Sequence, residues 1–405
     1  MAGWGPADFP SALATLQRDV ARERARVEAS PGQWMPLETL AMVLHARGQL
    51  NGSHADHAAA LDAVNAARAA APAASGPVLA RAVVALSLHQ NTIAREEVAR
   101  LAHFAIPPAP SDLAEAEAIR GDVAFYAGHY ARAIRHYRAA DRIERSPGTM
   151  VRLADWHRHM GDFDAARTLL GRGLADRATT TPWMRASYLL QLGAIELQSG
   201  NWAAAERLFS AADRAFPDWW LVKAHLGQMA AVRSDFATAE MLYREAMTGA
   251  ERPSVMDALA ALYRAMGRTA DADALAVRAA ALWNARVDSH PEAYADHAFE
   301  AALAAGDPVR AWRLAALNYR ARPYGDGRIG LARAALARGR AQSARAILEE
   351  LERTGWRSTE QYRVLADVCT QIGDRTCAAR ARRQALAISP QAYHPRADLL
   401  AFGHH

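Results

Sequence analysis

The sequence predicts an all-α solenoid in which helical hairpins stack one on another. Three observations predict this fold. Short turns, nearly all centred on glycine, recur at successive spacings of 33, 39, 34, 33, 39, 33 and 34 residues. Small side chains recur at fixed distances on either side of each turn. Hydrophobic residues make up 51% of the 405 residues, and many of them are alanine, a strong helix former. A fixed period of this length indicates a stacked array of repeats.

Eight turns mark the hairpins. They are centred on Gly128, Gly161, Gly200, Ser234, Gly267, Gly306, Gly339 and Gly373. The two spacings of 39 fit a period of 34 residues with five extra residues between hairpins. Each turn is therefore expected to join two antiparallel helices of one repeat.

The hairpin around Gly200 shows the repeat most clearly. Gly200 can adopt a positive φ and end the first helix tightly. Gly193 and Ala205 are small enough to let the two helices approach closely, and Phe209 fills the gap towards the neighbouring hairpin. Pro217 ends the second helix, because proline lacks a backbone N–H and clashes with the preceding turn.

The same template fits the other turns, with one departure. Phe299 stands where a small residue is expected before Gly306, and Pro308 follows that turn. The pattern resembles the tetratricopeptide repeat (TPR) family over residues 114–390, in eight copies. The resemblance implies a right-handed superhelical solenoid of TPR-like helical hairpins. It also implies that the first helix of each hairpin lines a concave groove and that the second lines the outside.

Both ends of the chain depart from this pattern. Within residues 1–113, helices are expected over 10–29, 36–47, 55–71, 77–89 and 92–105. We interpret them as degenerate TPR-like hairpins that continue the stack; the alternative is a separate N-terminal helical domain. Residues 391–405 form a short tail, too short for a full capping helix. Terminal repeats normally need a polar cap, so this end favours a partner surface, a homo-oligomer contact or a truncation.

The charge is basic but does not point to nucleic acid. The net charge is +5, and nearly all the positive charge is arginine because Lys223 is the only lysine. An arginine- and alanine-rich chain is typical of a GC-rich, bacterial genome. No basic stretch is interleaved with aromatic residues as a base-stacking surface requires.

No apolar run reaches the ~20 residues of a membrane-spanning helix. The first residues also lack the basic and apolar regions of a signal peptide. The chain is therefore either cytoplasmic or one whose leader has been removed.

Two polar patches are expected on the groove side, given the helix arrangement that the resemblance implies. The first gathers Asp122, Tyr126, Arg152, Asp155, His159, Gln191 and Gln198. The second gathers Asp257, Arg264, Glu292, Asp296, His297, Glu300, Asp326 and Arg333. Glu292, Asp296 and Glu300 form an i, i+4, i+8 ladder of carboxylates, which opposes helix formation unless cations answer it. Arginines of adjacent hairpins, a metal ion or a basic peptide could supply these cations.

A metal or small polar ligand is the alternative occupant of residues 292–300. It would use His290, His297 and Glu300. However, the sequence contains no motif with metal-ligand spacing, such as His-Glu-x-x-His or paired Cys-x-x-Cys. We therefore predict no bound metal and no cofactor.

Two adjacent tryptophans mark a further candidate site. Neighbouring residues on a helix point about 100° apart, so Trp219 and Trp220 cannot both enter the same pocket. Either Trp220 faces the groove as an apolar anchor, bordered by Lys223 and His225, or both tryptophans pack between repeats.

Neither a known peptide clamp nor a catalytic motif is present. Members of the family that grip acidic C-terminal tails need a lysine and an asparagine one turn apart on the inner face. This chain has Ala118 with Asp122, Leu190 with Ala194, and Ala224 with Gln228 at those places. It also lacks a nucleophile elbow, a P-loop and a dinucleotide-binding glycine motif. We therefore predict a protein that is not an enzyme.

The two cysteines flank the last turn. Cys369 and Cys377 lie four residues on either side of Gly373, which favours a Cα separation within the ~4.4–6.8 Å that a disulfide requires. A bridge would imply an oxidising compartment, such as a bacterial periplasm. The alternative is a pair of small, buried, reduced thiols.

Together these features predict a scaffold or adaptor that binds a protein or peptide segment in its concave groove. A sensor or carrier for a metal or small polar ligand is the second hypothesis. A self-assembly module that meets another copy through its C-terminal end is the third.

Overall fold

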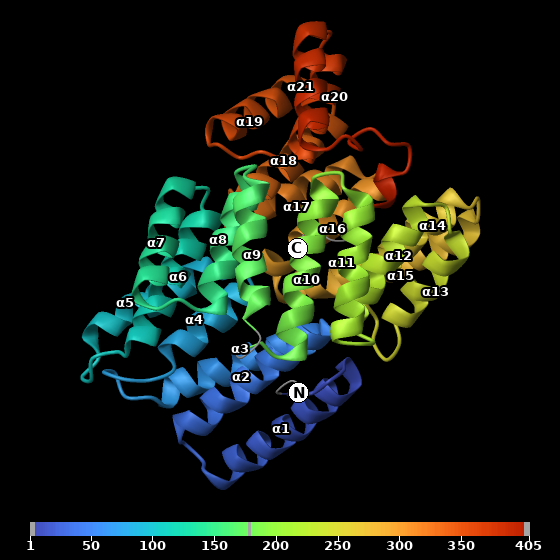
Figure 1. Cartoon of the computed structure of the whole chain (residues 1–405). Helices are drawn as coiled ribbons and strands as arrows, with labels where there is room; N and C mark the ends of the chain where they lie inside the picture. The colour runs from blue at the N-terminus through green and yellow to red at the C-terminus, as the bar shows by residue number, and fades with distance from the viewer. Residues whose placement is uncertain (1–4, 177–179, 401–405) are drawn as a thin grey trace. The chain divides into compact units, whose positions relative to one another are not determined.

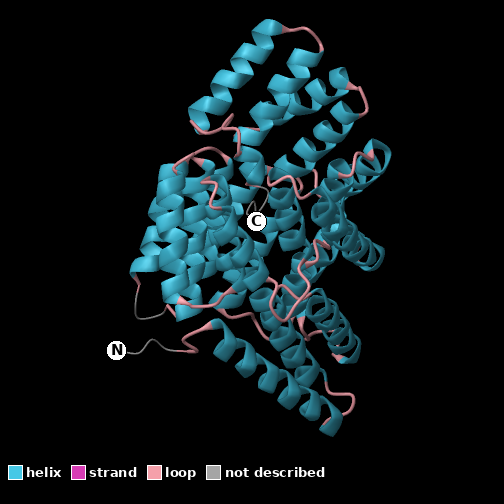
Figure 2. Ribbon diagram, turned by 90° about the vertical axis from the view of Figure 1, so that its right-hand side faces the viewer, coloured by secondary structure: helices cyan, strands magenta, loops and turns pink. Residues whose placement is uncertain are grey.

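The structure is a computed structural model that describes residues 5–176 and 180–400. These residues form twenty-one α-helices and two short 3₁₀ helices, joined by short loops, and include no strand (Figure 2). The predicted all-α solenoid of TPR-like hairpins is confirmed. No helix in the described part of the chain combines the length and apolarity needed to cross a bilayer.

The chain divides into two compact units, and the boundary falls inside α8 (Pro147–His159). The first unit is Gly5–Leu153, and the second comprises the described residues from Ala154 to 400. The remaining elements of the first unit are α1 (Phe9–Ala29), α2 (Trp34–Asn51), α3 (His54–Ala70), α4 (Val78–Ser87), α5 (Asn91–Arg100), η1 (Leu101–His103), α6 (Pro110–Tyr126) and α7 (Tyr130–Ile143).

The second unit contains the remaining hairpins. Its elements after α8 are α9 (Phe163–Ala175), α10 (Pro182–Gln198), α11 (Trp202–Ala215), α12 (Trp220–Val232), α13 (Phe236–Ala246), α14 (Pro253–Ala265), α15 (Thr269–Ser289), α16 (Pro291–Ala304), α17 (Pro308–Ala321), α18 (Gly325–Ala337), α19 (Ala341–Arg353), α20 (Thr359–Gln371), α21 (Arg375–Ile388) and η2 (Ala397–Leu399). Within each unit, successive helices pair as hairpins that pack on their neighbours along the chain (Figure 1).

The weak repeats near the N-terminus also form hairpins, α2 with α3 and α4 with α5. The first of these differs from the expected boundaries. Helix α2 continues to Asn51, so the turn is confined to Gly52 and Ser53. Gly52 adopts a φ of 69°, and the Ser53 hydroxyl accepts a hydrogen bond from the Asp56 N–H and caps α3.

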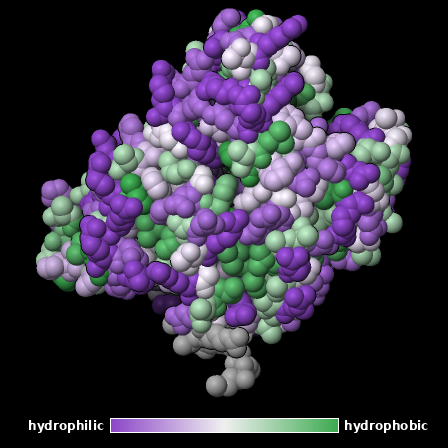
Figure 3. All heavy atoms as spheres, turned by 45° about the horizontal axis from the view of Figure 1, so that its top comes forward, coloured by the Kyte–Doolittle hydropathy of each residue, from purple (hydrophilic) through white to green (hydrophobic). Residues whose placement is uncertain are grey.

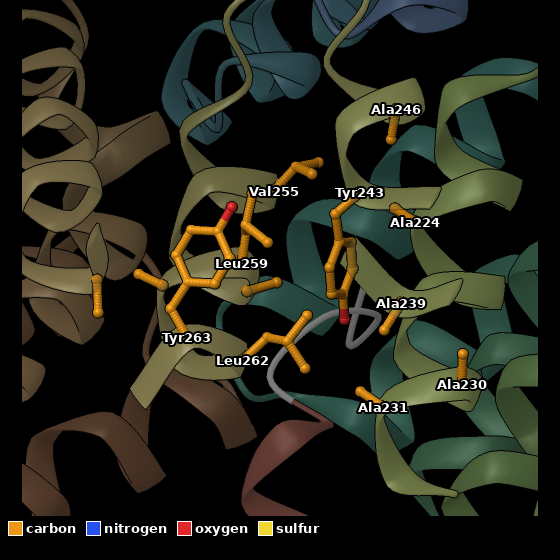
Figure 4. Packing of buried hydrophobic residues seen from close by; sticks show 13 residues of the cluster. Ala224, Ala230, Ala231, Ala239, Tyr243, Ala246, Val255, Leu259, Leu262 and Tyr263 are labelled. Atoms are coloured by element: carbon orange, nitrogen blue, oxygen red, sulfur yellow. The ribbon is translucent and has the colours of Figure 1, made fainter. Parts of the chain in front are cut away.

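Glycines in the first helices let large aromatic rings of the second helices approach. A Cβ atom added at Gly193 would lie 2.4 Å from the Phe209 ring, and one added at Gly227 would lie 3.0 Å from the Tyr243 ring. Figure 4 shows the Tyr243 ring inside its hairpin, with Ala224 and Ala239 beside it. The small residue and the large ring therefore form one packing unit that fixes the distance between the two helices.

Replacing Gly193 with alanine is expected to lower the free energy of unfolding by about 1–3 kcal/mol, because Phe209 must leave its position. Gly171→Ala is the matched control, since Gly171 lies inside α9 with open space around its missing Cβ. This control should gain up to about 1 kcal/mol from the better helix propensity of alanine. Urea unfolding of the two variants measures the difference, and equal effects would contradict this packing arrangement.

The departure at Gly306 proves to be an exchange of volume between the two helices. Phe299 in α16 occupies the position that is glycine or alanine in the other first helices, whereas Ala315 in α17 occupies the position that holds Phe209 in α11. Both are buried in one hydrophobic cluster. The hairpin keeps its packed volume with the large and small partners interchanged.

The second unit also joins segments that lie almost 200 residues apart. The Arg357 N–H donates a hydrogen bond to the His159 carbonyl oxygen at 3.0 Å. The Trp356 ring stacks on the His159 ring at 4.2 Å, and the Arg357 side chain covers Gly161. We call these contacts the seam, formed by residues 159–161 and 355–357. The seam ties the loop between α19 and α20 to the end of α8.

The last hairpin carries a disulfide and a polar outer face. Cys369 and Cys377 are bridged across its turn, with their Cα atoms 5.7 Å apart. The arginines at 375, 382 and 383 are exposed on α21, and Figure 3 shows a largely hydrophilic surface over this part of the chain. The polar face that the sequence interpretation found missing is therefore present on the last helix itself.

Candidate functional site

Charged side chains from the first helices of several hairpins meet in the second unit. We call them the inner cluster, which comprises Asp155, Arg158, Asp296, Glu300, Arg322, Asp326, Arg333 and Glu360. They come from α8, α16, α18 and α20, with Arg322 just beyond α17. Part of the first predicted patch and part of the second are thereby brought together.

Arginines answer the carboxylates of α16. Arg322 Nη2 lies 2.9 Å from Asp296 Oδ2, and Arg333 Nη2 donates to Glu300 Oε2 at 2.9 Å. Arg333 also pairs with Glu360, at 3.1 Å. Of the cation sources that the sequence left open, arginines take this role: Arg333 comes from the neighbouring hairpin, and Arg322 follows α17 of the same hairpin.

Asp326 is affected by the charges of four other members of the inner cluster. Burial and the nearby charges of Glu360 and Asp155 together raise the pKa of Asp326 to about 7, against the lowering effect of Arg158 and Arg322. At neutral pH this carboxyl is therefore shared between its protonated and charged forms. A cation placed beside it would favour the charged form.

The inner cluster has an excess of acidic groups and is accessible to solvent. It contains five carboxyl groups and three arginines, which gives a formal charge of 3 − 5 = −2 when all are ionised. Asp155 keeps 38% and Glu300 52% of the side-chain surface exposed. Protein atoms surround these groups and strip part of their hydration, but water and a ligand side chain can still reach them.

The raised pKa of Asp326 predicts a pH dependence of stability. Its folded-state pKa of about 7 exceeds the unfolded value of about 3.9, so the folded chain holds the proton more tightly. This contribution to the free energy of unfolding is complete at low pH and is lost as pH rises from about 4 to 7. The free energy of unfolding of the Asp326→Asn variant should therefore match that of the parent chain near pH 4 and exceed it at pH 8.

For one proton, the slope of this difference cannot exceed about 1.4 kcal/mol per pH unit. Urea midpoints of both chains at pH 4, 5, 6, 7 and 8 measure it. A difference that stays constant with pH would count against the raised pKa.

Asp257 and His297 of the second predicted patch form a separate group around Trp283. The indole Nε1 donates to Asp257 Oδ2 at 2.8 Å, and burial raises the pKa of Asp257 to about 6. His297 stacks on the same indole at 4.6 Å, and burial lowers the pKa of His297. Arg264 lies 3.6 Å from Asp273 on α15. Asp257 and His297 are thus used in packing between α14, α15 and α16, whereas Arg264 and Asp273 form an exposed pair.

The described residues do not support the metal alternative. They contain no group of three or more His, Cys, Asp and Glu side chains placed to hold a metal ion. His290 lies between α15 and α16 and contacts Ser289 at 3.2 Å. Glu300 is paired with Arg333.

Three residues of the first patch, Asp122, Tyr126 and Arg152, lie in the first unit. Arg152 contacts Asp122 and Glu115, each at 2.9 Å, and Tyr137 donates to Asp122 at 3.0 Å. Burial raises the pKa of Asp122 to about 6, against the effect of Arg152. The Tyr126 ring packs edge-on against His89, with 5.5 Å between ring centroids.

Three candidates near the paired tryptophans do not form an open anchor. His225 is buried and stacks on Phe209 at 4.6 Å. Lys223 lies 3.5 Å from Asp213 on α11 and 3.8 Å from Glu245 on α13, so it faces second helices. Trp219 is buried, and Trp220 is half-buried beneath the guanidinium of Arg252.

His159 also differs from expectation, because it stacks on Trp356 in the seam and keeps only 12% of its side-chain surface exposed.

The sequence did not lead us to Arg158, Arg322 and Glu360. Glu360 was within reach, since it precedes its turn by the same thirteen residues as Asp326. Arg322 was not, because it follows a second helix and enters the cluster only through the fold.

Repeated hairpins, ordered along the chain with charged side chains on their first helices, define an α-helical repeat protein. A family model described as tetratricopeptide repeat matches residues 254–292, which cover most of α14 and α15. The repeated hairpins and this match support an assignment to the tetratricopeptide repeat family. The fold suggests a protein-interaction scaffold, and proteins with such repeats are generally non-enzymatic.

Two solved structures are similar to this chain. The yeast Tom70 crystal structure is 14% identical with a TM-score of 0.40, and the match covers 95% of this chain and 92% of that one. The Cut9 and Hcn1 hetero-tetramer of the APC/C is 13% identical with a TM-score of 0.36, over 98% of this chain and 93% of that one. No curated protein sequence matches the chain.

Proposed function

We propose that the chain is a non-enzymatic scaffold that binds a protein or peptide segment along the inner cluster, and that this segment carries basic side chains. One observation supports the proposal above the others. Asp326 lies among Asp155 and Glu360 with a pKa near 7, in a cluster with two more carboxyl groups than arginines.

A lysine or arginine of the partner would complete this electrostatic arrangement. Beside Asp326 it would stabilise the charged carboxylate and release the proton that the free protein holds near pH 7. Affinity is therefore expected to increase from pH 6 to pH 8 and to weaken with added salt. The cluster would also disfavour acidic segments, because the carboxylates of Asp155 and Glu300 would repel their negative charges.

The test compares three immobilised forms of the full chain in an extract of its native host. The inner variant combines Asp326→Asn with Glu360→Gln, and the control variant combines Asp164→Asn with Asp273→Asn. Both control carboxylates lie on second helices and are largely exposed, at 97% and 74% of the side-chain surface. Each variant therefore replaces two carboxylates with two neutral amides.

We expect the parent chain and the control variant to capture the same protein in similar amounts. The inner variant should capture at least tenfold less of it. The capture should weaken when the salt concentration is raised. Equal capture by all three forms would place the binding surface elsewhere. Capture by the inner variant alone would show that the carboxylates oppose binding.

A further inference from the structure

The segment that follows α21 lies on other hairpins of the same unit. Residues 389–400 leave the last helix and run across the turns of earlier repeats. Ser389 and Pro390 approach Gly200 so closely that a Cβ atom there would lie 2.7 Å from Ser389 Oγ and 2.9 Å from Pro390 Cδ. The turn between α10 and α11 therefore accepts the segment only because it has glycine at this position.

Three further contacts continue the path. The His394 ring meets the Trp202 ring edge-on, with 4.8 Å between centroids. Arg396 Nη1 donates to the Val232 carbonyl oxygen at 3.3 Å, at the C-terminus of α12, where the helix dipole favours a cation. Leu399 is half-buried against the hydrophobic cluster that includes α12 and α14.

We infer that these turns form a docking surface for a peptide segment, which we call the corner strip, and that residues 389–400 are its resident occupant. The corner strip comprises Gly200, Trp202, Val232 and the apolar side chains of α12 and α14 around Leu399. It is distinct from the inner cluster, so the inference does not depend on the function proposed above.

The contacts define the chemistry of a competing partner segment. It presents a small residue or proline at Gly200 and a flat ring at Trp202 four residues later. An arginine follows two residues further on, to reach the end of α12, and a leucine follows three residues after that. The indole Nε1 of Trp202 is buried and makes no hydrogen bond within residues 5–176 and 180–400. A partner with an acceptor there would gain a contact that the resident segment does not make.

The resident segment is held weakly enough to exchange. Its ion pair joins Arg363 to Asp398, whose side chain is 83% exposed, and exposed pairs contribute little. Several of its N–H groups bond within the segment, as from Ala397 to the His394 carbonyl at 2.8 Å. The segment is nevertheless tethered, so its effective concentration reaches the millimolar range and a free peptide competes poorly. Docking in trans should therefore become visible once the resident contacts are weakened.

The experiment uses the full chain and a fluorescent peptide with the sequence of residues 389–400, Ser-Pro-Gln-Ala-Tyr-His-Pro-Arg-Ala-Asp-Leu-Leu. Arg396→Ala with Leu399→Asp removes two resident contacts without changing the corner strip. We expect this variant to bind the peptide at least tenfold more tightly than the parent chain does. Amide hydrogen exchange in residues 389–400 should be faster in the variant. A peptide that lacks the arginine should bind at least fivefold more weakly.

Tyr393→Ala is the matched control, because Tyr393 belongs to the same segment and is 41% exposed. It should change neither peptide binding nor hydrogen exchange. Faster exchange in the double variant without tighter peptide binding would overturn the inference, as would unchanged exchange. Light scattering that shows the parent chain as a dimer, which the double variant dissociates, would overturn the assignment of the occupant to the same chain.

Discussion

Replacing Trp356 with alanine is expected to lower the free energy of unfolding by about 3–5 kcal/mol, the usual cost of removing a fully buried tryptophan. The indole is completely buried and lies so close to Gly325 that a Cβ atom there would overlap it, at 2.0 Å. It also stacks on His159 and meets Tyr324 edge-on. The substitution leaves a cavity that these rings cannot fill without moving.

The same substitution is expected to open the seam. The amide of Arg357, which bonds to the His159 carbonyl oxygen, should exchange faster with solvent. Trp312→Ala is the control, because Trp312 is only half-buried and lies beneath Arg338 and Arg340. Urea unfolding with hydrogen exchange separates the two variants. Equal losses of stability, with unchanged exchange at Arg357, would show that Trp356 fills space without holding the seam.

Loss of the disulfide is the second large effect. We propose that the bridge between Cys369 and Cys377 forms in the native protein. Reduction is then expected to lower the free energy of unfolding of the last hairpin by about 2–3 kcal/mol, the loop-closure term for a loop of this length. Because each hairpin is stabilised by its neighbours, α20 and α21 should unfold before the rest.

Urea unfolding with and without reductant, followed by hydrogen exchange in α21, measures this effect. The double variant Cys369→Ser with Cys377→Ser should resemble the reduced protein and should not respond to reductant. Two free thiols in unfolded, unreduced protein would refute the bridge.

Predictions at the level of the hairpin succeeded because their signals are local. Gly193 and Phe209 face each other because the turn at Gly200 fixes how the two helices pair, and spacing from that turn shows this in the sequence. The exchange of Phe299 with Ala315 shows where spacing alone fails. A large residue at a small position looks like a broken repeat until its partner is seen to be small.

The structure groups those predicted site residues whose position follows from their own repeat. Asp296, Glu300, Asp326 and Arg333 were expected in one patch, and the structure places them in the inner cluster. His225 had the register of a candidate but is buried, since Phe209 of the preceding hairpin covers it. A register position identifies the side of a helix but not what the neighbouring hairpin brings to that side.

By itself the sequence determined the class of the protein: its helices, its turns and the order in which hairpins pack on their neighbours. These depend on contacts within about one repeat length, which glycine, alanine and proline spacing records directly. Only the tertiary structure decided which distant segments meet, namely Trp356 with His159, Asp326 with Asp155, and Arg396 with Val232. Such contacts depend on the small rotation between successive hairpins, added over several repeats, and no local spacing in the sequence records that sum.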